Sequence, residues 1–223
     1  MRTHFSDTDI LQLLHQPAYA HLREQLYTLR YASGNMVTAG PQDPNSIFLV
    51  ESGRLRVYLA YGDKEFTLAH LRAGDIYSTH PRTLITTLEP TVLHFIPTHR
   101  FQGWLQKTPQ LGTAVLRVLG EMLGQTFTII EGLAFKDITC RLAELLLHEV
   151  RRNGAFDGTG YRVDMGLTIE QMASILGSSR QTVSTQLNEL ERSGLLEKLG
   201  RGTYRVLNTE ALAACCPIAG PAV

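Results

Sequence analysis

The chain has 223 residues, of which 43% are hydrophobic, and it carries 21 basic and 21 acidic side chains, so its formal net charge is zero. This composition fits one or two globular domains and excludes a disordered protein. No apolar run reaches about 18 residues and the N-terminus lacks the apolar core of a secretion signal, so we expect a cytoplasmic protein without a membrane span. Three cysteines, an odd number, argue against a disulfide framework and fit a reducing compartment.

The first hundred residues predict two short helices, over about 7–15 and 17–27, followed by short β-strands. Alternating apolar and polar residues indicate these strands, which lie at 46–50, 54–59, 65–70 and 91–96. Turn residues such as Ser52-Gly53 and Gly74-Asp75 separate them closely enough for a compact antiparallel barrel or roll. A barrel of this size can enclose one small ligand.

A long helix is predicted over 110–135, and it is apolar on two sides, so it needs two partners. The spacing of the first apolar stripe suits pairing with a second copy of the chain, and the second stripe would cover the barrel. Gly112, Gly120 and Gly124 each cost helix stability of about 1 kcal/mol relative to alanine, which close packing or a close ligand would offset. The first stripe is Leu111, Val115, Val118, Met122 and Ile129, and the second is Leu116, Leu119, Leu123, Phe127 and Ile130.

After a break at 135–137, a helix over 138–152 and a glycine-containing loop at 153–161 lead to a helix-turn-helix pattern. Thr168 is a good N-cap for the first helix, whose apolar residues are Ile169, Met172, Ala173 and Leu176, and Gly177 ends it. Ser178 or Ser179 caps a second helix that buries Val183, Leu187 and Leu190. A hairpin with a Gly-Arg-Gly turn at 200–202 follows as a wing.

The second helix has the residues of a DNA recognition helix near its start. Arg180 can pair bidentately with guanine, and Gln181 and Ser184 are further candidate base readers. Ser179 and Arg201 complete the predicted DNA-contacting set, and Arg205 of the wing would lie beside the DNA backbone. The alternative reading is an ordinary helical hairpin with a polar face.

The predicted fold is therefore α+β, with an antiparallel β-roll, a long helix and a winged helix-turn-helix. We expect an effector domain with an N-terminal tail at 1–109, a dimerisation helix at 110–135, and a DNA-binding domain with a C-terminal tail at 136–223. This order resembles the CRP/FNR family of transcription regulators over about residues 20–210, and within it the CooA-like CO sensors. The resemblance is carried by the strings 52–59, Gly74-Asp75 with His80, 118–120, 135–137 and 177–182.

The resemblance implies a b-type haem in each roll, with His80 as the imidazole ligand of ferrous iron. The N-terminal amine of the partner chain would be the second ligand, and here it belongs to Met1, with His4 as the alternative. Carbon monoxide would displace this second ligand. By the same match, the CO pocket would be lined by Val115, Leu116, Leu119 and Gly120.

Two features depart from, or stand outside, that pattern. Ser78 lies where some CooA-like proteins carry a cysteine that ligates ferric haem, so we expect no thiolate-to-histidine switch. We expect Cys140 to be a core residue of its helix. The dipeptide Cys216-Pro217 only superficially resembles a haem-binding motif. The other histidines show no mutual zinc-ligand spacing.

The resemblance thus implies a homodimer that binds CO, reads a palindromic site on double-stranded DNA and activates transcription through RNA polymerase. A cyclic-nucleotide sensor is the main alternative, because Gly74-Asp75 and Arg82-Thr83 partly match a phosphate cradle, although Leu84 follows where alanine is expected. An iron–sulfur sensor is disfavoured, since the N-terminal third has no cysteine. A haem enzyme or gas carrier is the alternative of another class, but no catalytic motif is present, so we expect no enzyme.

Overall fold

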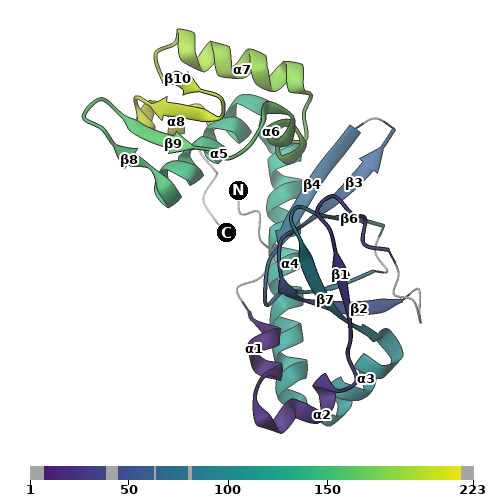
Figure 1. Ribbon diagram of the computed structural model, residues 1–223. Coiled ribbons are helices and arrows are strands. Elements are labelled where there is room, and N and C mark those ends of the chain that lie inside the picture. Colours follow the sequence, from purple (N-terminus) through teal and green to yellow (C-terminus); the bar gives the residue numbers. More distant parts are fainter. Residues whose placement is uncertain (1–7, 39–44, 63, 80–81, 217–223) are drawn as a thin grey trace. The chain divides into compact units, whose positions relative to one another are not determined.

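The computed structural model describes residues 8–38, 45–62, 64–79 and 82–216 (Figure 1). The chain divides into two compact units, residues 2–127 and 128–223. The long helix α4 (Pro109–Phe135) contributes to both. Within the described residues, no helix has both the length and the apolar character that crossing a membrane requires. The other helices of the first unit are α1 (Ile10–Leu14), the 3-10 helix η1 (Pro17–Tyr19), α2 (Ala20–Arg23) and α3 (Thr98–Lys107).

Two antiparallel sheets form the first unit, which confirms the predicted antiparallel β domain. One sheet has the order β1-β7-β2-β5 and the other β4-β3-β6. Apolar side chains from both sheets share one core, which includes Phe48, Val57 and Phe95. The strands are β1 (Tyr27–Tyr31), β2 (Ser46–Ser52), β3 (Leu55–Tyr61), β4 (Lys64–Leu71), β5 (Ile76–Ser78), β6 (Leu84–Thr87) and β7 (Thr91–Pro97).

The helix predicted over 17–27 is wrong in its second half. Pro17 starts the short η1 turn, α2 ends at Arg23, and β1 begins at Tyr27. Strand β1 alternates partly buried and exposed side chains and pairs with β7, where the Tyr27 and Phe95 rings stack at 5.5 Å between centroids. Pairing with a strand more than 60 residues away in sequence outweighs the helical reading of this segment.

The two apolar faces of α4 are not packed as the sequence predicts. Leu111 and Val118 of the first stripe are buried in the core of the first unit, and Val115 and Met122 pack against it. The second stripe, which was expected to cover the roll, is exposed: Leu116 is 70% exposed, Leu123 54% and Phe127 60%. The face of α4 that is available to a second copy is therefore the second stripe.

The second unit is built on α5, whose first turn is capped by the Asp137 carboxylate, which accepts from the Cys140 N–H at 2.8 Å. Its sheet has the order β10-β11-β9-β8, so the loop predicted at 153–161 contains β8 and the first residue of β9. Buried residues of α5, α6, α7 and the sheet form one core. The elements are α5 (Ile138–Asn153), β8 (Ala155–Phe156), β9 (Tyr161–Asp164), α6 (Ile169–Leu176), α7 (Arg180–Arg192), β10 (Leu196–Gly200), β11 (Thr203–Val206) and α8 (Thr209–Ala213).

Cys140 is buried in this unit, as expected of a core residue, but its thiol is not free. It forms a disulfide with Cys216, with the two Cα atoms 4.6 Å apart. The odd cysteine count, which argues against a disulfide framework, therefore did not predict this bond. The odd count misled because two of three cysteines pair and only Cys215 is left over.

Candidate DNA-binding and effector sites

The helix-turn-helix is formed by α6 and α7, and its caps are those that the sequence predicts. The Thr168 side chain accepts from the Gln171 N–H, and the Gln171 side chain accepts from the Thr168 N–H, which makes a capping box. Gly177 ends α6 in the left-handed region at φ 62°, which glycine adopts without strain. Of the two candidate serines, Ser179 caps α7, because its Oγ accepts from the Thr182 N–H at 3.1 Å.

Helix α7 presents a polar surface at its N-terminal end. Val183, Leu187 and Leu190 are buried, as predicted, while Arg180 and Gln181 are exposed and Ser184 is half-buried. Among the described residues, Arg180 has no hydrogen bond or salt bridge from its side chain. The positive end of the helix dipole lies at the same place, so this end of α7 suits a phosphate or an electronegative base edge. The Ser179 hydroxyl is already used by the cap, which leaves it less free to read DNA.

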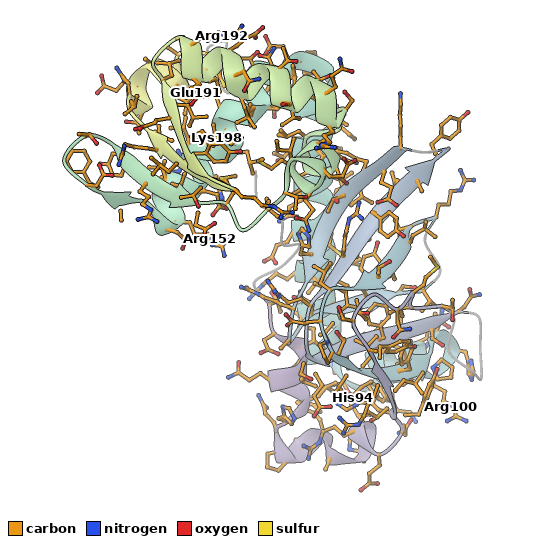
Figure 2. All side chains as sticks on the ribbon, turned by 45° about the horizontal axis from the view of Figure 1, so that its top comes forward. His94, Arg100, Arg152, Glu191, Arg192 and Lys198 are labelled. Atoms are coloured by element: carbon orange, nitrogen blue, oxygen red, sulfur yellow. A yellow bond between two sulfur atoms is a disulfide. The ribbon has the colours of Figure 1, made fainter. Side chains whose placement is uncertain are left out.

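The other end of α7 is tied to the wing. Figure 2 labels Glu191 and Arg192 on α7 and Lys198 on β10, and the Lys198 N–H donates to Glu191 Oε1 at 3.3 Å. In the wing, β10 pairs with β11 and Gly202 takes φ 76° in the turn between them. The predicted hairpin is thereby confirmed, and Arg201 lies exposed in its turn.

Arg205, which the sequence places beside the DNA backbone, is paired with two carboxylates in the structure. Its Nε donates to Asp157 Oδ2 at 2.7 Å, and its Nη1 donates to Glu197 Oε2. This guanidinium holds the pKa of the Asp157 carboxyl well below its usual range. Two carboxylates therefore neutralise the charge of Arg205. Through them, Arg205 of β11 links the loop between β8 and β9 to strand β10 of the wing. Asp157 gave no sequence signal, because its partner lies 48 residues away.

The two wing arginines should consequently differ in their effect on DNA binding. Arg201→Ala is expected to reduce the slope of log affinity against log salt by about 1, because one phosphate contact and its released counterion are lost. Arg205→Ala removes an arginine that is already paired, so the slope should stay unchanged while the thermal stability falls. Fluorescence anisotropy with duplex DNA at several salt concentrations measures both. If both variants lowered the slope of log affinity against log salt equally, the different roles assigned to Arg201 and Arg205 would be contradicted.

The break between α4 and α5 is bridged by charged side chains. Lys136 Nζ lies 2.7 Å from Glu144 Oε1 and 3.7 Å from Glu131 Oε1, so one lysine joins the last turns of α4 to α5. The hydrogen bond to Glu144 raises the pKa of Lys136 and keeps it charged. The sequence predicts a break at 135–137 but gives no sign of these partners, although Lys136 and Glu144 lie only eight residues apart.

The candidate effector residue His80 belongs to the connection between the two sheets of the first unit. Strand β5 ends at Ser78 in one sheet, and β6 begins at Leu84 in the other. The Tyr77 hydroxyl lies 3.3 Å from the Thr83 hydroxyl, which draws the two ends of this connection together. His80 lies within it but outside the described residues, as do Met1 and His4 at the N-terminus.

The Gly74-Asp75 turn is occupied by the chain itself. The Ile10 N–H donates to the Gly74 carbonyl at 3.2 Å, and a Cβ on Gly74 would come within 2.7 Å of the Asp9 side chain. Asp75 is buried, and its Oδ2 accepts from the Arg72 N–H at 2.7 Å. Two carboxylates thus lie at this turn, and the carboxylate of Asp75 is held locally. Arg82, the other part of the possible phosphate cradle, is exposed.

The four predicted CO-pocket residues lie on one stretch of α4 but not on one face. Val115 packs against the core of the first unit, whereas Leu116, Leu119 and Gly120 are exposed. A Cβ on Gly120 or Gly124 would meet no atom within 4 Å. In the part of the chain that the structure describes, Leu116, Leu119 and Gly120 are therefore open to the outside rather than enclosed.

Both ring nitrogens of His94 have partners within the first unit. On β7, its Nδ1 lies 2.9 Å from the Thr28 hydroxyl and its Nε2 lies 3.2 Å from Glu51 Oε2 (Figure 2). Burial lowers the pKa of His70, with further lowering from the neighbouring Arg56 and Arg54 guanidinium groups. His70 lies on β4, and His94 is held on β7 by its two ring-nitrogen contacts.

Comparison with known proteins agrees with this architecture. Residues 140–215 match the Crp-like helix-turn-helix domain. The structure of a CooA mutant from Carboxydothermus hydrogenoformans is 37% identical and has a TM-score of 0.81, covering 96% of this chain and 98% of that one. The reduced Fe(II) CO-sensing protein from R. rubrum is 33% identical with a TM-score of 0.54, covering 95% and 99%.

A curated relative responds to a different effector. The CRP-like cAMP-activated global transcriptional regulator of Mycobacterium tuberculosis is 27% identical over 212 residues, which is 92% of this chain and 94% of the relative. These similarities extend along more than nine-tenths of the chain, and the proteins concerned are all transcription regulators or CO sensors of this architecture. The chain belongs to the CRP/FNR family of transcription regulators.

Proposed function

We propose that this regulator is a CO-responsive, haem-dependent activator that binds a palindromic DNA site as a homodimer. The observation that carries the proposal is its likeness along nearly the full chain to CooA, at 37% identity, against 27% for the cAMP-activated relative. The effector-binding half is included in that likeness, so the inference does not rest on the helix-turn-helix alone.

The donor chemistry of the first unit is suited to haem b rather than to a cluster. Its residues include histidines but no cysteine, and a neutral imidazole is a common axial ligand of haem iron. His80 would hold the iron from one side, and the Met1 amine of a partner chain, or His4, from the other. Haem, when bound, supplies the iron at which carbon monoxide binds. With Ser78 in place of a thiol, oxidation should leave nitrogen ligands only.

The exposed stripe of α4 supports a homodimer. Leu116, Leu119, Leu123 and Ile130 follow the three-and-four spacing of a helix pair, and each is more than half exposed in the single chain. A second copy on this stripe would cover Leu116, Leu119 and Gly120 and enclose them as an apolar lining for CO. It would also place two α7 helices for successive major grooves, about 34 Å apart. Such a dimer activates transcription by contacting RNA polymerase.

A cyclic nucleotide is the second candidate effector, supported by the cAMP-activated relative. The Gly74 turn argues against it. The Asp9 carboxylate lies against Gly74, and a cyclic phosphate placed beside it would be repelled rather than bound. Arg82-Thr83 would have to overcome this repulsion, while the Thr83 hydroxyl is within hydrogen-bonding distance of Tyr77.

The absorption spectrum of the purified protein, reduced and then exposed to CO, tests the proposal. We expect sharp ferrous bands that shift with CO in the wild type, and DNA binding that increases with CO. His80→Ala should lose the six-coordinate ferrous spectrum and the CO response. His15→Ala is the matched control, because His15 is an exposed residue at the end of α1, and it should behave as the wild type.

Two outcomes would overturn the proposal in different ways. A protein that takes up no haem even on reconstitution contradicts haem sensing and makes a cyclic nucleotide the first effector to test. A protein that binds haem and CO but no DNA in either state would instead be a gas carrier or haem enzyme.

A further inference from the structure

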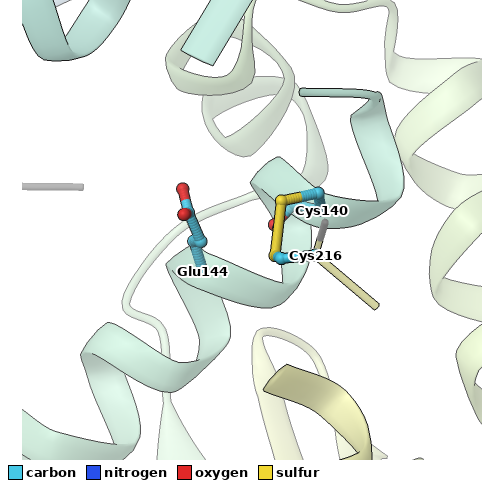
Figure 3. Close-up of side chains that lie close together, drawn as sticks. All are labelled: Cys140, Glu144 and Cys216. Atoms are coloured by element: carbon cyan, nitrogen blue, oxygen red, sulfur yellow. A yellow bond between two sulfur atoms is a disulfide. The ribbon is translucent and has the colours of Figure 1, made fainter. Parts of the chain in front are cut away.

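The two cysteines of the disulfide come from opposite ends of the DNA-binding unit. Cys140 lies in the first turn of α5, and Cys216 follows the last helix, α8, 76 residues later (Figure 3). Their Cα separation of 4.6 Å lies within the range that a disulfide spans. A bond between them therefore closes a loop that contains α5, α6, α7 and the wing.

Other contacts hold the two thiols in place without the sulfur–sulfur bond. Leu212 of α8 is fully buried in the core that α5 shares with α6 and α7, and Cys216 packs against this core. Asn208 caps α8 by accepting from the Ala211 N–H at 2.9 Å. The reduced thiols are thus kept adjacent by packing, which favours rapid closure of the bond.

The two thiols differ in accessibility. Cys140 is completely buried, and Cys216 is partly exposed. The exposed thiol can be reached by a small oxidant, and the buried one only by its neighbour.

We propose that Cys140 and Cys216 form a reversible modification site for low-molecular-weight disulfides. The Cys216 thiolate attacks a disulfide RSSR, which forms a mixed disulfide and releases one RS⁻. The Cys140 thiolate then attacks Cys216 Sγ, which closes the intramolecular bond and releases the second RS⁻. The two cysteine protons end on the two leaving thiolates. Two cysteine thiols are oxidised, and one RSSR is reduced to two RSH.

We expect the Cys140–Cys216 bond to be reversible, because a transcription regulator acts where its DNA is, in a reducing compartment. In reducing compartments disulfides are usually transient and redox-sensing rather than permanent. The bond fixes the first turn of α5, where the Thr139 hydroxyl donates to Gln186 of α7. Oxidation therefore stiffens the unit at the turn that contacts the recognition helix. This inference is independent of the proposed haem function.

A metal site is the competing explanation for this cluster. Cys140, Glu144 and Cys216 offer ligand atoms that all lie within 4.8 Å of one another. The Glu144 carboxylate, however, accepts from Lys136 Nζ at 2.7 Å, and a metal ion would have to displace that ammonium group. The cluster therefore offers a metal ion only three ligands, and Glu144 is already paired with Lys136. The two cysteines, in contrast, are close enough to form a disulfide.

The test uses the full-length protein equilibrated with mixtures of reduced and oxidised glutathione. Peptide mass mapping should find Cys140 linked to Cys216, with two thiols lost per chain. The Tm of the DNA-binding unit should rise by about 10 °C on oxidation and return after dithiothreitol, because the cross-link constrains the unfolded chain. Cys215→Ser should behave as the wild type. Cys216→Ser should lose both the linked peptide and the Tm shift, as should Cys140→Ala.

Three results would overturn the proposal. One is a stable glutathione adduct on Cys216 with Cys140 still free. Another is a disulfide that uses Cys215. The third is uptake of one equivalent of Zn²⁺ by the reduced protein that protects both thiols from oxidised glutathione, which would make the cluster a metal site. Cys216→Ser keeps the test decisive if Cys140→Ala fails to fold, because Cys216 is partly exposed and lies after the last helix.

Discussion

Leu123→Glu combined with Phe127→Glu is expected to leave the protein monomeric and to weaken its binding to a palindromic site by about 100-fold or more. The two side chains are 54% and 60% exposed in the single chain and lie on the same stripe of α4. In a helix pair they would be buried, and a carboxylate on each would be desolvated beside its copy in the partner. A monomer holds one half-site only, so the effective concentration of the second recognition helix is lost.

Analytical ultracentrifugation and anisotropy on the palindromic duplex measure the two effects. Arg117→Glu is the matched control, because it adds the same charge to an exposed position of α4 outside the stripe, and it should remain dimeric. A double variant that stays dimeric would show that the exposed stripe does not pair copies. A monomer with unchanged affinity for the palindrome would contradict the need for two recognition helices.

The error over the faces of α4 has a definite physical origin. Both stripes have three-and-four spacing and similar apolar content, so periodicity indicates two partners without saying which face meets which. Which face of α4 packs against the first unit depends on the shape of that unit's core, into which Leu111 and Val118 pack. Sequence alone could predict that the helix is shared, and only the packed structure could assign its faces.

Local signals were reliable where they act within a few residues. Thr168, Gly177 and Ser179 end or begin helices as predicted, because a cap is satisfied by a backbone group three or four positions away. Strand β1 and helix α3 were missed although each has a usable pattern. Tyr27, Leu29 and Tyr31 alternate, and Phe101, Trp104 and Leu105 have helical spacing.

Long-range pairs left no such signal. Arg205 pairs with Asp157, 48 residues away in sequence, and Cys140 bonds to Cys216, 76 residues away. Composition and residue spacing do not predict which distant residues the fold brings together. For the effector site, the residues that carry the proposal, His80, Met1 and His4, lie outside the described residues. Their roles stay predictions from the resemblance, whereas the placement of Arg180 on an exposed helix start follows from the structure.

Arg180→Ala is expected to weaken binding to the cognate site by about 5- to 150-fold, which corresponds to about 1–3 kcal/mol. Arg180 is the first residue of α7, exposed, and next to the Ser179 cap that fixes the helix start. A guanidinium in that position can donate two parallel hydrogen bonds to guanine O6 and N7, and alanine removes both. The preference at one base pair per half-site should relax, while preferences at the other positions remain.

The specificity change distinguishes base reading from phosphate contact. The wild type first selects its operator from a random duplex pool, and competition with every single-base change then gives the preference at each position. Arg192→Ala, at the exposed far end of α7, is the matched control and should keep all preferences (Figure 2). If Arg180→Ala instead weakens all sequences equally and lowers the salt slope by about 1, Arg180 binds a phosphate, and the base-reading role falls to Gln181 and Ser184.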